Sequence, residues 1–207
     1  MLQSMVDSPT ATRAEVSDVA NAILDAADAV MLSAETSVGS YPVESVKMMI
    51  RIAEQTEDFI DRSSNQLAAD VNVLVPRVPT AVAHGTNLLA RELDAKLVAL
   101  WTQTGNTARL LSKCRLPSVV VGLSPDEHVC RRMAMYYGIE PVQMNRDDDV
   151  ITMLSEVDAV LLSRGLAVSG DMIVVIAGTR LQQVGSTNAI LIHLVGNTAT
   201  GTPEITG

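Results

Sequence analysis

The sequence predicts an α/β fold: a short helix–strand–helix segment, then a five-stranded mixed α/β sandwich. Short apolar runs alternate with amphipathic stretches over residues 80–195, the pattern of a sheet covered by helices. Hydrophobic residues make up 47% of the chain and aromatic residues only 2%, so the core must be aliphatic. The last two apolar runs are only about eleven residues apart, without helical periodicity. That is too few for a parallel crossover, so the fifth strand is expected to be antiparallel.

Residues 9–42 are predicted to contain a helix, a buried strand and a turn into a second helix. Thr12 and Glu15 have the spacing of a capping box, in which each side chain bonds the other residue's backbone. The apolar run Ala29–Leu32 is short and bounded by polar residues, as in a buried parallel strand. It ends in the polar cluster Ser33–Thr36, at the strand end where ligands gather in parallel α/β folds. An N-cap for the following helix explains this cluster about equally well.

The next helix is predicted from Pro42 to about Ser63, because apolar residues recur on one face. A lone strand cannot cover both of its faces, so this first part is expected to be the edge of a larger domain. The polar and proline-containing stretch 64–79 is the expected boundary.

Nine elements are predicted in the second part of the chain, from apolar runs and from residues that favour helix starts and stops. The five strands are expected at residues 97–101, 118–121, 142–144, 172–177 and 189–195. The four helices are expected at residues 80–94, 107–114, 125–138 and 147–166.

The stretch with the strongest chemical signal follows the first of these strands and opens a helix. It reads Thr102-Gln103-Thr104-Gly105-Asn106-Thr107-Ala108-Arg109. Hydroxyls, a glycine and a helix N-terminus together favour an anion site. The stretch has neither the Gly-Lys-Ser/Thr of a Walker loop nor a GxGxxG fingerprint. An ordinary capped strand-to-helix loop explains the same residues, and on sequence alone it is the more common case.

The charge distribution limits the class of partner. The net charge of −9 and the pI near 4.7 argue against nucleic acid, which requires a basic footprint. A local basic cluster in the second part is compatible with a small anionic ligand, although solvated helix faces are the more common explanation. Its members are Arg109, Lys113, Arg115, Arg131 and Arg132.

Two cysteines, Cys114 and Cys130, occur without a metal or redox motif, so reduced thiols in a cytoplasmic protein are expected. The chain has no apolar run of about 18 residues and no basic start followed by an apolar region. We therefore expect neither a membrane partner nor a secretion signal.

Several ordered motifs near the start of the chain resemble one family. They are Met1-Leu2-Gln3-Ser4-Met5, Thr12-Arg13-Ala14-Glu15-Val16-Ser17-Asp18-Val19-Ala20-Asn21, Met31-Leu32-Ser33-Ala34-Glu35-Thr36 and Tyr41-Pro42. They are similar to the late barrel region of pyruvate kinase, and the resemblance continues through nearly all of the chain. It implies the last elements of a catalytic (β/α)8 barrel over residues 1–64 and the C-terminal allosteric domain over residues 65–207.

The resemblance also implies an activity: transfer of a phosphoryl group from phosphoenolpyruvate to ADP, giving pyruvate and ATP, by a homotetramer that uses Mg²⁺ and K⁺. The family pattern has Thr-Gln immediately before the position of Met1, which implies an internal methionine. The main catalytic residues and all metal ligands would then lie upstream, and this chain alone would be inactive. A freestanding, non-enzymatic sensor of a phosphorylated metabolite is the alternative.

Three residues of the first part have roles implied by the resemblance. Ser33 and Glu35 match a pair at the barrel mouth that supports the active-site network without performing the main chemistry. Arg13 matches a residue near the subunit interface and the active site. On spacing alone, an ion pair of Arg13 with Glu15 or Asp18 is equally expected.

In pyruvate kinases a loop similar to residues 102–107 holds a phosphate of the allosteric effector, and a loop between the last two strands closes over it. The implied effector-binding residues are Thr102, Thr104, Gly105, Asn106, Thr107, Arg180, Gly185 and Thr187. Asn106 stands where some members have a basic residue, and residues 181–183 depart from the Pro-Gly-rich segment of members activated by fructose bisphosphate. A sugar monophosphate or a nucleotide monophosphate is therefore favoured over a bisphosphate.

Overall fold

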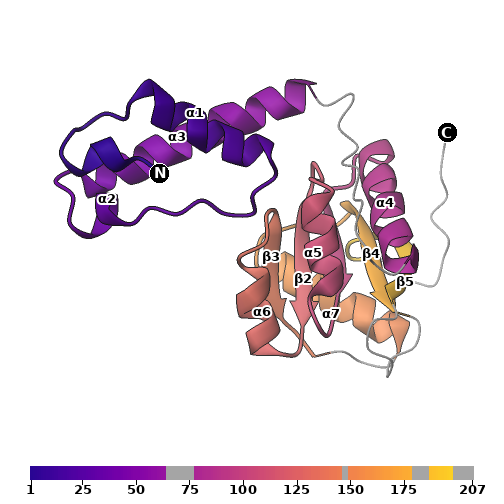
Figure 1. The fold of residues 1–207 in the computed structure, drawn as a ribbon. Coiled ribbons are helices and arrows are strands. Elements are labelled where there is room, and N and C mark those ends of the chain that lie inside the picture. The colour runs from indigo at the N-terminus through magenta and orange to yellow at the C-terminus, as the bar shows by residue number, and fades with distance from the viewer. Residues whose placement is uncertain (64–76, 146–148, 179–186, 198–207) are drawn as a thin grey trace. The chain divides into compact units, whose positions relative to one another are not determined.

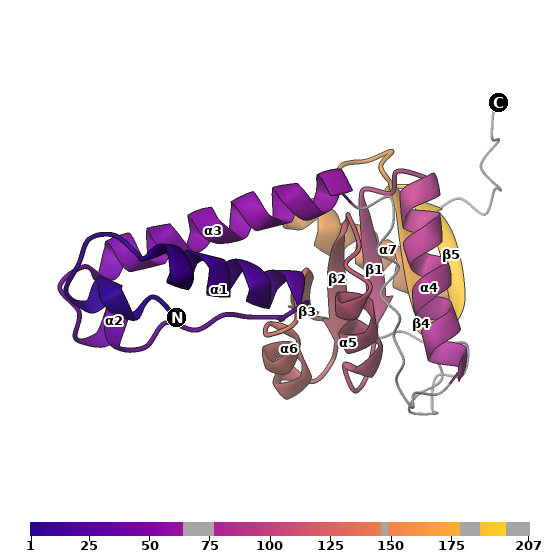
Figure 2. The same ribbon diagram turned by 45° about the horizontal axis from the view of Figure 1, so that its top comes forward.

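The computed structural model describes residues 1–63, 77–145, 149–178 and 187–197 (Figure 1). The chain divides into two compact units, Met1–Asp70 and Val71–Gly207. In Figures 1 and 2 the first unit is drawn in indigo and purple, and the second runs from magenta to yellow.

The first unit is helical. It consists of η1 (Gln3–Val6, a 3₁₀ helix), α1 (Arg13–Leu24), α2 (Ala34–Ser37) and α3 (Pro42–Ser63). The apolar faces of α1 and α3 pack together with η1 around one small core. Its buried members are Leu2, Met5, Val19, Ile23, Met49 and Ile52.

The predicted capping box is confirmed at the start of α1. The Thr12 Oγ1 atom accepts a hydrogen bond from the Glu15 N–H at 3.3 Å, and Glu15 Oε2 accepts one from the Thr12 N–H at 2.9 Å. Two of the amide donors that a helix start leaves unpaired are thereby satisfied. The same Glu15 carboxylate accepts from the Ser4 N–H at 2.6 Å and from the Ser4 hydroxyl, which ties η1 to α1.

The predicted strand at residues 29–32 is wrong. In the described part of the first unit this segment is irregular and pairs with no other strand. Val30 and Leu32 still pack against the small core, whereas Met31 is 73% exposed. The apolar run seen in the sequence therefore reflects packing on helices. A strand also requires a hydrogen-bonding neighbour, which this unit does not supply.

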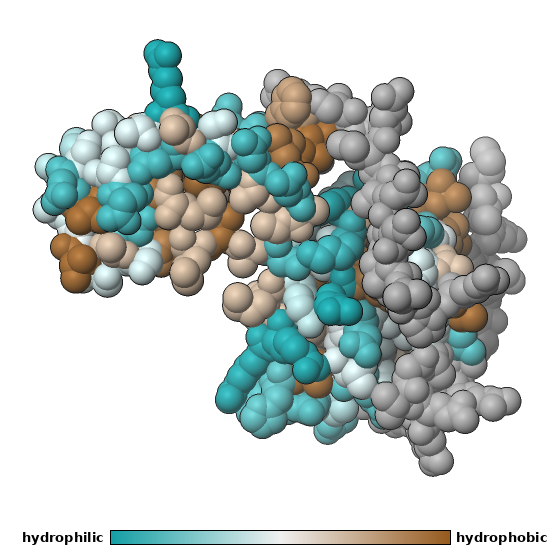
Figure 3. Space-filling model, viewed as in Figure 1, coloured by the Kyte–Doolittle hydropathy of each residue, from teal (hydrophilic) through white to brown (hydrophobic). Residues whose placement is uncertain are grey.

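The first unit exposes much apolar surface, visible as brown patches in Figure 3. Val38 is 78% exposed, Phe59 is 62% exposed and Val43 is 57% exposed. An apolar hollow of about 660 Å³ lies along α1 and α3, with Val16 and Leu24 on one wall and Phe59 on the other. Surface of this kind is typical of a face that further structure or a partner covers.

The second unit is built on one five-stranded sheet with the order β3-β2-β1-β4-β5. Its strands are β1 (Leu97–Trp101), β2 (Val119–Ser124), β3 (Ile139–Gln143), β4 (Met172–Gly178) and β5 (Thr187–Leu194). The first four strands are parallel to one another and β5 is antiparallel to β4, as the short connection predicted.

Helices cover both faces of this sheet (Figures 1 and 2). They are α4 (Arg77–Glu92), α5 (Asn106–Lys113), α6 (Glu127–Met133) and α7 (Val150–Ser163). The first three lie on one face, where Ala90, Leu111 and Met133 meet the strands. Helix α7 lies on the other face, where Val157 and Leu161 pack against the sheet.

Several predicted boundaries in this unit are shifted by two or more positions, and two of the shifts have a visible cause. Helix α6 ends at Met133 instead of Gly138, because a turn separates it from the sheet and Gly138 takes a positive φ of 68° there. Strand β3 begins at Ile139, three positions before the predicted start at Val142. The polar Glu140 and the imino acid Pro141 interrupt the apolar run, so the first half of β3 was not predicted from the sequence.

Candidate functional site

The candidate site is the loop that joins β1 to α5. Thr102 continues the parallel pairing by donating its N–H to the Leu123 carbonyl at 2.9 Å. The chain then turns back on itself: the Gly105 N–H donates to Thr102 Oγ1 at 3.0 Å, and the Asn106 N–H donates to Thr104 Oγ1 at 3.4 Å. Hydroxyl oxygens therefore shape the turn at the carboxyl end of the strand, where open α/β sheets bind ligands.

Gly105 is required here for two reasons. It is the N-cap of α5 with a φ of 74°, a left-handed conformation that side chains disfavour. A Cβ atom at this position would also lie 3.3 Å from Met133 Cγ and 3.4 Å from Val129 Cγ1. The glycine thus lets α6 approach the loop closely.

A second strand contributes to the same place. Thr187, the first residue of β5, lies with its Oγ1 atom 2.8 Å from Oγ1 of Thr107 in the first turn of α5. The two residues are 80 positions apart and are 8% and 5% exposed. The sequence-based prediction brought both residues to one site, and the geometry places their hydroxyls in contact.

The hydroxyls have donor capacity left over. Two hydroxyls in contact carry two hydrogens, and only one hydrogen can lie between the oxygens. Thr102, 5% exposed, accepts through its oxygen, and its own hydrogen has no acceptor among the residues that the structure describes. Buried polar hydrogens are normally paired, so these are suited to an anionic ligand.

The other predicted residues of the site divide into two groups. Thr104 is half-buried and Asn106 is exposed, and both lie in the loop itself. Arg180 and Gly185, with the departing segment 181–183, lie outside the described residues.

Sequence reasoning did not include Arg132 among the site residues. This side chain reaches from α6 to the loop, and its Nη2 donates to the Thr104 carbonyl oxygen at 2.6 Å. The only sequence signal was its place in the basic cluster. That cluster does not converge as a whole, since Arg131 pairs with Glu127 and Arg115 lies 3.6 Å above the ring of Tyr137.

Glu35 in the first unit is almost fully buried, with 1% exposure. Its Oε1 accepts from the Met1 amine at 2.9 Å and from the Leu2 N–H at 2.8 Å, and its Oε2 accepts from the Ser33 N–H at 2.8 Å. The Ser33 N–H, the residue's own N–H and the Met1 amine outweigh burial and lower the pKa of Glu35 to about 2. The carboxylate is therefore ionised and fixes the backbone around it.

Ser33 is the N-cap residue of α2, as the alternative interpretation of the cluster predicted, but its side chain makes no capping hydrogen bond. Its supporting role at an active site stays a prediction. Arg13 is exposed and, among the described residues, forms no ion pair with Glu15 or Asp18. The surface-pair alternative is therefore wrong, and a role at an interface stays a prediction.

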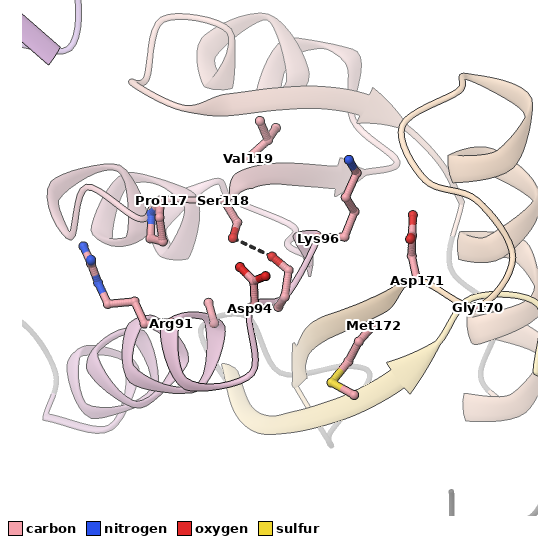
Figure 4. A pocket seen from close by; sticks show the side chains of 11 residues that line it. Arg91, Asp94, Lys96, Pro117, Ser118, Val119, Gly170, Asp171 and Met172 are labelled. Carbon is pink, nitrogen blue, oxygen red and sulfur yellow. Dashed lines mark hydrogen bonds between the residues drawn. The ribbon is translucent and has the colours of Figure 1, made fainter. Parts of the chain in front are cut away.

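A separate hollow of about 720 Å³ lies at the opposite edge of the sheet, where β1, β2 and β4 begin (Figure 4). Charges of both signs line it, from Arg91 and Lys96 and from Asp94 and Asp171. Ser118 donates its hydroxyl to the Ala95 carbonyl within it at 2.7 Å. This mixed lining is less suited to a phosphate than the loop after β1.

Within the described ranges, no three His, Cys, Asp or Glu side chains are grouped so as to hold a metal ion. In the same part of the chain, none of the helices has the length and apolar character needed to span a bilayer.

The sheet order and the helices on both faces define an open-sheet α/β domain, with a hydroxyl-lined loop at the carboxyl end of β1. Comparison with known families agrees: the family described as "Pyruvate kinase, alpha/beta domain" matches residues 80–193. The family described as "Pyruvate kinase, barrel domain" matches residues 1–46. The chain belongs to the pyruvate kinase family, as its motifs indicated.

Curated relatives and a solved structure extend this result. A pyruvate kinase of Staphylococcus aureus (strain bovine RF122 / ET3-1) is 38% identical over 95% of this chain and 34% of its own length. The pyruvate kinase of Staphylococcus epidermidis is 39% identical over the same shares. The crystal structure of a pyruvate kinase from Cryptosporidium parvum has a TM-score of 0.73 at 32% identity, covering 94% of this chain and 38% of that one. The chain thus spans about a third of the length of the relatives it matches.

Proposed function

We propose that this chain is the regulatory portion of a pyruvate kinase and that the loop after β1 binds a phosphate group of the allosteric effector. Residues 1–64 supply the last barrel elements, and residues 65–207 form the effector domain. The observation that carries the proposal is the buried contact between Thr107 and Thr187, which brings two separate segments to one hydroxyl-lined site.

The chemistry of the loop supports a phosphate ligand. The first amides of α5 point along the helix axis toward its positive end, where anions are stabilised. The hydroxyls of Thr102 and Thr107 add donors next to that helix start. A phosphate monoester offers acceptor oxygens to both kinds of donor. With Asn106 in place of a basic residue, a sugar monophosphate or a nucleotide monophosphate is the favoured effector, and a bisphosphate is not.

The whole enzyme transfers a phosphoryl group from phosphoenolpyruvate to ADP in the cytoplasm, as a homotetramer with Mg²⁺ and K⁺. The resemblance places the ligands of those ions upstream of this chain, and the buried Glu35 carboxylate accepts its hydrogen bonds from N–H donors. Glu35 and Ser33 support the active site by holding backbone in place, and Arg13 contacts a neighbouring subunit. Phosphoryl transfer is mainly positioning and charge neutralisation, so the chain alone is inactive.

Isothermal titration calorimetry tests the effector site. The chain is titrated with AMP, ribose 5-phosphate, glucose 6-phosphate and fructose 1,6-bisphosphate. A monophosphate should bind, and Thr102→Val and Thr107→Val should each abolish binding. Ser163→Ala is the matched control, because this exposed hydroxyl lies on α7, which covers the other face of the sheet. Unchanged affinity in both threonine variants would remove the site.

A coupled assay with lactate dehydrogenase tests the second half of the proposal. The purified 207-residue chain should form no pyruvate from phosphoenolpyruvate and ADP above background. Measurable turnover would contradict a regulatory portion that lacks the main catalytic residues.

A further inference from the structure

We infer that Arg132 is the cationic residue of the effector site and determines its affinity for a doubly charged phosphate. This inference rests on the proposed function, because it concerns the same loop. It adds a side chain from α6, an element that neither the sequence motif nor the loop itself includes.

The position of Arg132 follows from how α6 packs. Helix α6 begins at Glu127, where the Asp126 carboxylate caps it by accepting from the His128 N–H at 2.8 Å. On its inner face, Val129 and Met133 approach Gly105 so closely that a Cβ atom there would contact both.

The guanidinium lies beside the same glycine. Arg132 Nη2 is 3.8 Å from the position that a Cβ on Gly105 would occupy. It is held there by its hydrogen bond of 2.6 Å to the Thr104 carbonyl. Packing of the helix and anchoring of the side chain therefore place one positive charge next to the start of α5.

The hydrogen bond to the Thr104 carbonyl uses only part of the donor capacity of Arg132. A guanidinium has five N–H donors, and the Thr104 carbonyl takes one. In the described part of the chain, Arg132 has no carboxylate partner that would neutralise its charge. The remaining donors and the charge are available to phosphate oxygens, which match the planar guanidinium well.

Its sequence neighbour provides a sharp contrast. Arg131 is also exposed and on α6, but it pairs with Glu127 one turn earlier on the helix. Among the described residues, Arg131 makes no hydrogen bond to the loop. Of these two neighbouring arginines, Arg132 therefore belongs to the proposed site, whereas Arg131 forms an ion pair on the helix surface.

A purely structural role for Arg132, in which it only holds the Thr104 carbonyl in place, predicts a different effect of substitutions on ligand binding. Arg132→Gln removes the charge, and its shorter side chain also loses the hydrogen bond to the Thr104 carbonyl. Loss of such a clamp alone would weaken binding equally at low and at high salt, whereas loss of a ligand-binding cation weakens it mainly at low salt. Arg132→Lys keeps the charge and loses the planar fork, so it should restore part of the affinity that the glutamine variant loses.

The experiment is calorimetric titration of the full chain and its variants with glucose 6-phosphate and with AMP, at low and at high potassium chloride. Fluorescence of Trp101 and circular dichroism verify that each variant is folded. For whichever ligand binds the wild type, Arg132→Gln should weaken binding by about 10- to 100-fold, the range of a charge-assisted hydrogen bond. It should also reduce the salt dependence, because screening acts on the charge that was removed.

Arg131→Gln should bind as the wild type does. Equal binding by Arg132→Gln and the wild type overturns the inference while leaving the proposed function intact. Absence of binding to the wild-type chain overturns the proposed function and this inference with it.

Discussion

The hydroxyl contact between Thr107 and Thr187 leads to a quantitative prediction about the stability of the second unit. Each threonine is replaced by valine, singly and together. Valine has nearly the same shape and the same branching at Cβ, so the change removes a hydroxyl with little change in volume. Both positions are more than nine-tenths buried, so water cannot easily replace a lost partner.

The magnitude follows from which groups are left unpaired. Thr107→Val leaves the Thr187 hydroxyl buried without its partner at 2.8 Å, and Thr187→Val does the reverse. Each single change should lower the free energy of unfolding by about 1–3 kcal/mol, the cost of an unsatisfied buried polar group. The double variant removes both groups and should be nearly as stable as the wild type.

The assay is urea unfolding followed by tryptophan fluorescence. Trp101 is the only tryptophan in the chain, lies at the end of β1 and is 7% exposed, so its signal reports the unfolding of the second unit. Equal denaturant slopes for all variants would show that compactness is unchanged. If the two single effects simply add in the double variant, within about 0.5 kcal/mol, the hydroxyls are not coupled and the site geometry is wrong.

Three further changes test other parts of the structure. Gly39→Ala should destabilise the first unit by about 1–3 kcal/mol, because its Cβ would lie 2.6 Å from the Glu35 carbonyl oxygen. Hydrogen exchange of the α1 and α3 amides measures it, with Gly85→Ala, 3.5 Å from its nearest neighbour, as a tolerated control. Asp158→Asn should cost about 1–3 kcal/mol in urea unfolding, because the buried carboxylate joins α7 to His193 of β5 at 2.8 Å. The pKa of Glu35, lowered from 4.5 to about 2, makes the unfolded chain bind the proton first as pH falls. The contribution of the Glu35 carboxylate to the free energy of unfolding is therefore complete above about pH 4.5 and is lost as the pH falls toward 2. Glu35→Gln should make the acid transition, followed by circular dichroism, less steep.

Each of these has a contrary outcome. Equal exchange in Gly39→Ala and Gly85→Ala would show that the close backbone approach is absent. Unchanged urea unfolding of Asp158→Asn would mean that the carboxylate does not tie α7 to β5. An acid transition of Glu35→Gln as steep as that of the wild type would assign the pH dependence to other carboxyl groups.

The central strands of the second unit, β1, β2 and β4, could be predicted because their apolar runs are buried on both faces. β1 was predicted with its observed bounds, since all five of its residues are buried. The antiparallel direction of β5 followed from the shortness of the connection between the last two strands. The first unit was harder: the run at 29–32 has the composition of a strand but packs on helices instead. An apolar composition indicates that a segment is buried. A strand also requires a neighbouring strand to hydrogen-bond with, and the composition of the segment does not show whether one is present.

The same distinction explains what could be predicted of the site. The loop residues are consecutive in sequence, so their hydroxyls and Gly105 were recognisable together. Thr187 was included only through the family resemblance. Arg132 was not, because its contact with Thr104 depends on how closely α6 packs over the loop. Long side chains that reach a site from another element leave no local pattern in the sequence.

The most direct test of the account is the location of a bound phosphate. An isotope-labelled chain is titrated with glucose 6-phosphate or AMP while backbone amide resonances are followed by NMR. The account predicts saturable shifts at residues 102–107 and at Thr187. Shifts that concentrate instead at the mixed-charge hollow, at residues 94–96 and 170–172, would contradict it, as would a spectrum that does not change.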